Sequence, residues 1–213
     1  AAEDLQEYLN RITGADLPIL TDDEAPADGN CLLVGPTKQT AALGIEQPTG
    51  YPDAERVILR REENCVVLLG NDDGPYEGTG NAVTMFLEQL GCGWYGPDEL
   101  WQVVPEYPTL AVGVLEIDHE PAFRARFTQV YAQYPEVGSR WYLGGDKTST
   151  GHGIQALIPV DEHLESHPEW FALVDGKRDP LSHYGWQYDY SNRELAQAVA
   201  EKVVAELDAQ PLL

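Results

Sequence analysis

Residues 55–70, ERVILRREENCVVLLG, contain two runs of β-branched and leucine residues around the polar triplet at 62–64. Two such runs at this separation predict a β-hairpin. The second run leads into a glycine-rich loop at residues 70–80 and then into a helical pattern. One face of that predicted helix carries Val83, Phe86, Leu87 and Leu90. Hairpin, loop and helix together predict a sheet with a helix packed on it.

The glycine-rich loop resembles a phosphate-binding loop only in its position between a strand and a helix. It carries Asp72, Asp73 and Glu77 but no Lys or Arg, so a bound phosphate would be repelled. The G-x-G-x-x-G order is also missing. The three acids have no recognised metal-ligand spacing. We therefore interpret the loop as a solvated turn and expect no metal and no cofactor.

The elements around the hairpin complete a mixed α/β pattern. The spacing of Leu5, Tyr8, Leu9 and Ile12 predicts a helix that ends at Gly14. Residues 17–20 and 31–36 are strand candidates, residues 38–43 predict a short helix, and residues 91–97 and 101–105 predict two short strands. Residues 110–117 are a further strand or an extended linker. We therefore predict an α/β domain with a mixed sheet over residues 1–115.

The remaining residues, 116–213, predict a strand, a long loop, a second strand and a helix, which is the start of a β/α series. Residues 123–131 are the first strand, and residues 160–166 form a helix within the loop. The last helix, residues 194–208, repeats its apolar positions every four residues. Ser191 or Asn192 can cap it.

The charge of the chain excludes some classes of partner. The sequence has 36 Asp and Glu against 13 Lys and Arg, a formal net charge of −23. Binding to nucleic acid needs clustered cations, so nucleic acid and anionic membrane surfaces are not expected as partners. There is no apolar run of roughly 18 residues, the length of a membrane span.

The three cysteines, Cys31, Cys65 and Cys92, are far apart and lack metal-ligand spacing. Cys31 and Cys65 lie in apolar strand patterns, where a free thiol behaves as a small buried hydrophobe. We predict that all three are structural. Their odd number does not decide the redox compartment.

Residues 151–178 combine the features of a sugar-binding segment. His152 lies between two glycines, Trp170 and Phe171 offer flat apolar faces, and Lys177 and Arg178 offer hydrogen-bond donors. Polar donors beside aromatic faces suit a carbohydrate. The alternative is that His152 is an ordinary loop histidine and that the two aromatic residues belong to a core.

Two parts of the chain resemble known families. Residues 1–20 and 55–106, with GTGNAV and FLEQLGCGWYGP as their most specific elements, resemble the accessory domain in front of the catalytic barrel of alpha-glucuronidases and beta-hexosaminidases. PAFRARF, HPEWFALVDGKR and QYDYSNRELAQAVAEKV resemble the opening of the barrel in a bacterial family of glycoside-hydrolase-like proteins of unknown function.

The resemblance implies an accessory α/β domain followed by the first β/α units of a TIM-type barrel. Such a barrel takes about 250 residues, so residues 116–213 are expected to hold only its first two or so units. We therefore expect an incomplete barrel and a catalytic carboxylate pair beyond Leu213, and we leave the catalytic residues unassigned. Asp175, Glu169 and Asp189 lie near aromatic residues, but in so acidic a chain this proximity is expected by coincidence.

The resemblance also implies candidate substrate-binding residues. Arg126 occupies the place of an arginine that contacts sugar hydroxyls, although Phe127 follows where glycine is usual. His152 lies in a loop similar to a site loop of the bacterial family, and Trp141 could stack on a sugar. Alternatively, Arg126 pairs with Asp118 or Glu120, and Trp141 only packs.

The function implied is that of the N-terminal portion of an extracytoplasmic, secreted or periplasmic, carbohydrate-active enzyme of the glycoside hydrolase type. Its expected partner is an oligo- or polysaccharide, with Arg126, His152, Trp141, Trp170 and Arg178 as binding residues. Exposed strand edges of a partial barrel would pair with the rest of the barrel or drive self-association. The alternative is a non-catalytic carbohydrate-binding or scaffold protein.

Overall fold

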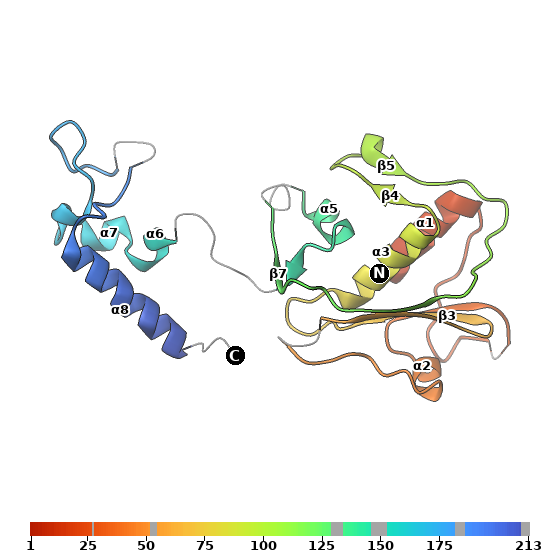
Figure 1. Ribbon diagram of the computed structural model, residues 1–213. Helices are drawn as coiled ribbons and strands as arrows, with labels where there is room; N and C mark the ends of the chain where they lie inside the picture. Colours follow the sequence, from red (N-terminus) through yellow and green to blue (C-terminus); the bar gives the residue numbers. More distant parts are fainter. Residues whose placement is uncertain (27, 52–54, 129–133, 146–152, 182–185, 210–213) are drawn as a thin grey trace. The chain divides into compact units, whose positions relative to one another are not determined.

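A computed structural model describes residues 1–26, 28–51, 55–128, 134–145, 153–181 and 186–209. The chain forms two units, Ala1–Lys147 and Thr148–Leu213. The first unit contains the larger sheet with its helices, and the second contains short helices and one long one (Figure 1).

The sheet of the first unit has four strands in the order β1-β3-β2-β6. The predicted hairpin is confirmed, because β2 and β3 are antiparallel with Val57 opposite Gly70. β1 lies parallel to β3, and β6 lies antiparallel to β2. The sheet is therefore mixed, as predicted. Its strands are β1 Cys31–Val34, β2 Val57–Glu62, β3 Cys65–Gly70 and β6 Glu116–His119.

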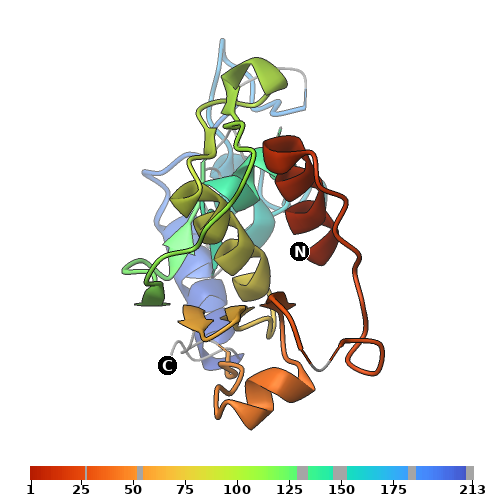
Figure 2. The same cartoon turned by 90° about the vertical axis from the view of Figure 1, so that its right-hand side faces the viewer.

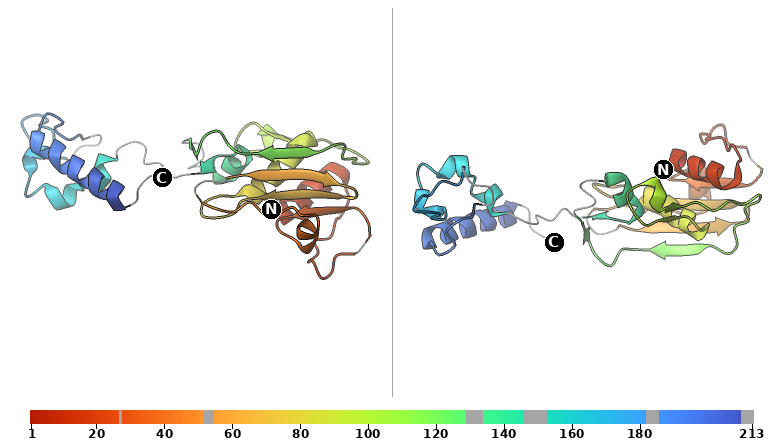
Figure 3. Two further views of the ribbon diagram at one scale, coloured as in Figure 1. Left: turned by 60° about the horizontal axis from the view of Figure 1, so that its bottom comes forward. Right: turned by 90° about the horizontal axis from the view of Figure 1, so that it is seen from above.

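Helices lie on both faces of this sheet, α1 and α3 on one and α2 on the other (Figures 1 and 3). Successive side chains of a strand point to opposite faces, so Leu59 and Leu68 pack in the core with α1 (Ala2–Thr13) and α3 (Gly78–Gln89). A smaller apolar cluster includes Val67 and Leu69. The short helix α2 covers residues Lys38–Ala42.

Two further strand pairs complete the first unit. β4 (Gly93–Trp94) and β5 (Gln102–Val103) form the predicted short hairpin, with the 3-10 helix η1 (Glu99–Trp101) in its turn. β7 and β8 pair antiparallel over two residues each, Ala125–Arg126 and Gly144–Gly145. Between them lies α5 (Pro135–Arg140).

The second unit packs its helices around a small aromatic core. Trp170, Phe171 and Tyr188 are buried there together with Ile158 and Leu195. Asn192 caps α8 as predicted, because its side-chain oxygen accepts hydrogen bonds from two backbone N–H groups of the first turn. The helices are α6 Ile154–Leu157, α7 Val160–His163, η2 Pro168–Trp170 and α8 Arg193–Ala209. None of the described helices has the length and apolar composition to cross a bilayer.

The described residues do not confirm the predicted start of a barrel. β6, which sequence patterning assigned to the second domain at residues 116–213, extends the sheet of the first unit, and the two units divide after Lys147. Successive barrel strands are parallel, whereas β7 and β8 are antiparallel. Phe171 and Tyr188 also meet in an antiparallel bridge. The described residues form an α/β structure with a mixed sheet but no closed barrel.

Two local predictions were wrong. Residues 17–20 form no strand, and Leu17, Ile19 and Leu20 are exposed. Apolar residues make a strand only where a neighbouring edge offers hydrogen bonds, and that pairing depends on the tertiary fold. Cys31 and Cys65 are not free thiols but form a disulfide. The parallel register of β1 and β3 places the two residues directly opposite each other.

Candidate functional site

The side chain of Arg126 is held in one position at β7. Its Nε donates to the carbonyl of Tyr142 at 2.6 Å, its Nη1 to the carbonyl of Phe123 at 2.5 Å, and its Nη2 to Oε1 of Glu55 at 2.5 Å. The ion pair is largely buried, with side-chain exposures of 14% for Arg126 and 8% for Glu55. The guanidinium is therefore oriented by three acceptors before any ligand arrives.

Arg126 does pair with an acid, but with Glu55 rather than with Asp118 or Glu120, the two partners that the sequence left as an alternative. Asp118 instead receives two hydrogen bonds from Arg56, which hold the pKa of the Asp118 carboxyl below its usual value. Glu55 lies two residues before the start of strand β2 and 71 positions before Arg126. No local pattern in the sequence marks Glu55 as a buried acid.

Residues 140–142, at the end of α5 and directly after it, contact other elements of the first unit. Arg140 pairs with Asp4 of α1, and its guanidinium lies 4.5 Å from the ring centre of Trp94 and 4.9 Å from that of Tyr8. Trp141 donates its indole N–H to the carbonyl of Trp94 at 2.7 Å. Trp141 thus packs against the β4–β5 hairpin, the alternative that the sequence left open.

Tyr142 adds a further contact to this segment. Its hydroxyl donates to the carboxylate of Glu88 on α3. Burial raises the pKa of Tyr142 above its usual value, and the hydrogen bond to Glu88 adds to the shift. The hydroxyl therefore stays protonated and acts as a hydrogen-bond donor over the physiological pH range.

Trp170 and Arg178 lie together in the second unit. The Trp170 indole is 6% exposed and stacks on His167 with ring centres 4.1 Å apart. The Nη1 of Arg178 donates to the carbonyl groups of Phe171 and Glu169, on either side of Trp170. It also pairs with Asp189 at 3.3 Å. Trp170 is thus a core residue here, and Arg178 fixes the backbone around it.

The carboxyl groups near these aromatic residues are stabilised in their charged form. A hydrogen bond from the Ser191 hydroxyl lowers the pKa of Asp189, and Arg178 lowers it further. The pKa of Glu169 is lowered as well, chiefly by a backbone hydrogen bond. A general acid of a glycosidase needs a raised pKa. Both residues therefore suit ion pairing rather than proton donation.

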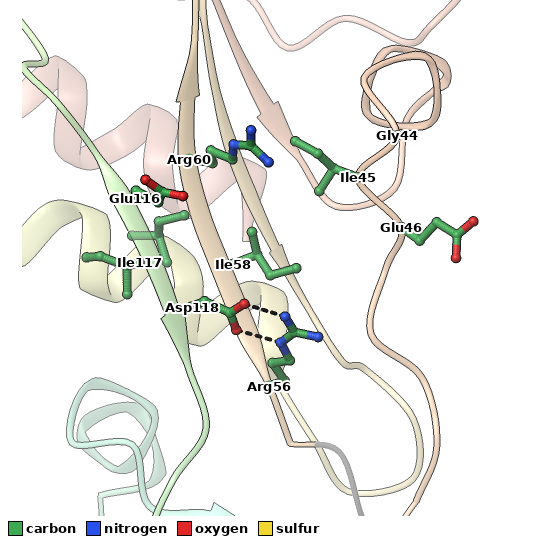
Figure 4. A pocket seen from close by; sticks show the side chains of 10 residues that line it. Gly44, Ile45, Glu46, Arg56, Ile58, Arg60, Glu116, Ile117 and Asp118 are labelled. Carbon is green, nitrogen blue, oxygen red and sulfur yellow. Dashed lines mark hydrogen bonds and ion pairs between the residues drawn. The ribbon is translucent and has the colours of Figure 1, made fainter.

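A hollow of about 330 Å³ lies on the sheet between the loop after α2 and strands β2 and β6 (Figure 4). Ile45 and Ile58 contribute apolar side chains, and Arg56 and Asp118 form an ion pair beside them. Arg60 pairs with Glu62 along the same strand. Its arginines are matched by acids of the protein itself, and the hollow is open to solvent, so it offers no clear ligand chemistry.

The glycine-rich loop at residues 70–80 has a structural role. Asp72 accepts from the backbone N–H of Thr79 at 2.9 Å and from the Thr79 hydroxyl at 2.6 Å, so it binds the first turn of α3. In the part of the chain that the structure describes, no three His, Cys, Asp or Glu side chains gather closely enough to hold a metal ion.

The candidate binding residues are distributed over both units. Arg126 and Trp141 belong to the first unit, and Trp170 and Arg178 belong to the second. Arg126 contacts the residue after Trp141, and Arg178 contacts the backbone beside Trp170. His152 lies outside the described residues.

The chain was compared with known proteins. A family model described as "Domain of unknown function (DUF4838)" matches residues 94–212, more than half of the 213 residues. The match begins in the β4–β5 hairpin and continues through α8. No curated protein and no solved structure shows significant similarity to the chain.

Proposed function

The chain belongs to the family that shares the domain of unknown function DUF4838, and on this premise we propose that it is the N-terminal portion of a carbohydrate-active enzyme of the glycoside hydrolase type. In this proposal the first part is an accessory α/β domain and the later part opens a β/α barrel. The general acid and its partner carboxylate lie outside residues 1–213. The resemblance of GTGNAV and FLEQLGCGWYGP to accessory domains supports this assignment.

The orientation of Arg126 is the observation that carries the proposal. The described contacts use three of the five N–H groups of its guanidinium. A rigid fork loses little conformational entropy when it binds two oxygens at once. In the families that the chain resembles, the matching arginine binds sugar hydroxyls. In this chain the ion pair with Glu55 fixes Arg126 in one orientation, which suits the same contact.

The disulfide between Cys31 and Cys65 supports an extracytoplasmic location. Disulfides persist in oxidising compartments and are rare in the cytosol. We therefore assign the protein to the periplasm or the extracellular space as part of the same proposal.

The test is to assay the natural protein that contains this chain on a panel of neutral and acidic oligosaccharides, with release of new reducing ends as the readout. Arg126→Lys keeps a cation beside Glu55 but removes the fork, and we expect kcat/KM to fall about tenfold or more. Arg56→Lys, in the exposed pair with Asp118, is the matched control and is expected to leave the rate unchanged. Absence of hydrolysis across the panel would count against the enzyme.

A non-catalytic carbohydrate-binding protein is the second candidate, because the fixed guanidinium of Arg126 can bind sugar hydroxyls without a catalytic carboxylate. It predicts saturable glycan binding by the natural protein without any bond cleavage. The same panel distinguishes the two candidates when binding and reducing-end release are measured on the same samples.

A further inference from the structure

The tip of the β4–β5 hairpin exposes three large apolar side chains within seven residues. Tyr95 is 71% exposed, Leu100 is 88% exposed and Trp101 is 52% exposed. The hairpin projects beyond the helices of the first unit (Figures 1 and 2). A group of large apolar side chains exposed in one place is a common sign of a binding surface.

The indole of Trp101 lies flat on Gly96. A Cβ atom added to Gly96 would lie 2.5 Å from Cγ of Trp101 and 2.9 Å from both Cδ1 and Cδ2. Because Cδ1 and Cδ2 are both bonded to Cγ, these distances put the Cβ position above the ring plane rather than at its edge. One face of the indole is thus backed by a glycine, and this leaves the other face for solvent.

The hydroxyl end of Tyr95 packs against Gly93. A Cβ atom on Gly93 would lie 2.8 Å from Cε2, 2.9 Å from Cζ and 2.9 Å from the hydroxyl oxygen of Tyr95. A position over the ring face would have only ring carbons nearest to it, so Gly93 lies against the hydroxyl edge of the Tyr95 ring. The hairpin therefore presents two exposed aromatic rings: Gly96 backs the face of the Trp101 indole, and Gly93 contacts the hydroxyl edge of Tyr95.

The base of the hairpin is anchored in the core. Trp94 is buried, and its indole N–H donates to the Tyr8 hydroxyl at 2.8 Å. The Tyr8 hydroxyl in turn donates to Gln102 Oε1 at 3.2 Å. Across the tip, the Tyr95 N–H donates to the Trp101 carbonyl at 2.9 Å. The exposed rings are thus held by a fixed backbone, and a ligand would not have to order them.

We propose that Trp101 and Tyr95 form a platform for the pyranose rings of a neutral polysaccharide. The C–H groups on the face of a pyranose are attracted to the negative face of an aromatic ring. Asp98 and Glu99, beside the platform, can accept hydrogen bonds from sugar hydroxyls, and the net charge of −23 disfavours uronates and sulfated sugars. Chains with equatorial linkages expose the flattest C–H faces.

This inference rests on the proposed function for its class of ligand, but the platform is a site separate from Arg126. The test uses this chain with cellohexaose and xylohexaose as neutral probes and hexagalacturonate as the anionic one. Isothermal titration and tryptophan fluorescence measure binding. We expect the neutral probes to bind with a dissociation constant of about 0.1 to 1 mM and the anionic probe to bind at least about tenfold more weakly.

Four variants distinguish stacking from other contacts. Trp101→Ala and Tyr95→Ala remove the rings and are expected to weaken binding about tenfold and about threefold. Gly96→Ala keeps the indole but displaces it, because the added Cβ would clash with the ring. We expect binding to weaken about fivefold, and circular dichroism checks that the fold is retained. Leu100→Ser removes the most exposed apolar side chain without touching a ring and is expected to change binding less than about twofold.

Three outcomes would overturn the platform: no saturable binding of either neutral probe, equal binding by wild type and Trp101→Ala, or a loss for Leu100→Ser as large as for Trp101→Ala. The last would indicate an apolar protein contact at the hairpin. These readouts do not depend on hydrolysis, so failure of the platform and failure of the enzyme proposal are observed separately.

Discussion

Arg126 and Glu55 form an ion pair that costs free energy to bury. Removing two charges from water is expensive, and their attraction repays it only when hydrogen bonds satisfy the remaining donors. Here the carbonyl groups of Phe123 and Tyr142 supply two of those bonds. Since a well-packed apolar pair is often as stable, the charged pair suits a role in binding.

Arg126→Met tests how strongly the pair depends on both partners. The substitution leaves the Glu55 carboxylate buried without its cation, and we expect the free energy of unfolding to fall by about 3 to 5 kcal/mol. Adding Glu55→Gln should recover part of that loss. Urea denaturation followed by tryptophan fluorescence measures both variants.

Arg56→Met is the control, because its pair with Asp118 is about half exposed and is expected to contribute only about 0 to 1 kcal/mol. Equal losses in Arg126→Met and Arg56→Met would show that the Arg126 pair is no different from a surface pair.

The cysteines give a second prediction at this scale. Burial raises the pKa of the Cys92 thiol, and the residue is almost inaccessible. We therefore expect no reactive thiol in the native protein, one after denaturation without reductant and three after denaturation with reductant. Thiol titration with a chromogenic disulfide reagent measures each state.

Cys92→Ser is the control for the thiol count and should abolish the thiol seen without reductant. The disulfide spans 34 positions, so its reduction is expected to lower the free energy of unfolding by about 4 kcal/mol. Three thiols without reductant would mean that the Cys31–Cys65 bond does not form.

At the scale of elements, two glycines allow β3 and α3 to cross closely. A Cβ atom on Gly70 would lie 2.2 Å from the carbonyl carbon of Gly78, and one on Gly78 would lie 2.4 Å from the backbone N of Asn71. The backbone of the strand end and that of the first helical turn therefore touch directly. This contact explains why glycines stand at both positions.

Gly70→Ala is expected to destabilise the fold by about 3 kcal/mol or more, because backbone atoms on both sides must move. The matched control is Gly80→Ala in the first turns of α3, where an added Cβ meets nothing within 4 Å. There we expect a gain of about 0.5 to 1 kcal/mol from helix propensity. Thermal denaturation compares the two, and similar midpoints for both variants would refute the close crossing.

Across the whole molecule, two effects change the free energy of unfolding in opposite directions as the pH falls. Relief of repulsion among the acids raises it, and loss of the paired carboxylates lowers it. Protonation first relieves repulsion among 36 acidic residues. The pKa of Asp118 is lowered by Arg56 and that of Asp189 by Ser191 and Arg178. Both carboxylates contribute fully to the free energy of unfolding above the pKa of Asp in the unfolded chain, near 3.8. The contribution is lost as the pH falls through the lower pKa of the folded protein.

We therefore expect the free energy of unfolding to hold or rise from pH 7 to about pH 5 and to fall below about pH 4. At pH 7, adding about 0.5 M NaCl should raise the melting temperature because it screens the net negative charge. Denaturation series over pH and salt measure both effects. A steady loss of stability between pH 7 and pH 5 would contradict this account.

The sequence determined much of the local structure. The periodicity of apolar residues predicted the hairpin of β2 and β3 and helices α1, α3 and α8. Residue type left Ser191 and Asn192 as candidates for the cap of α8, and Asn192 is the one that caps it. These features depend on neighbours within a few positions, where strand and helix repeats are directly readable.

Only the tertiary structure decided which distant groups meet. Arg126 pairs with a carboxylate 71 positions earlier, Arg140 with one 136 positions earlier, and Cys31 with a cysteine 34 positions later. It also decided that β6 joins the first sheet and that Trp170 is buried while Trp101 is exposed. With 36 acids in the chain, residue type alone cannot select one partner. Register, burial and chain crossing select it, and these exist only once the chain has folded.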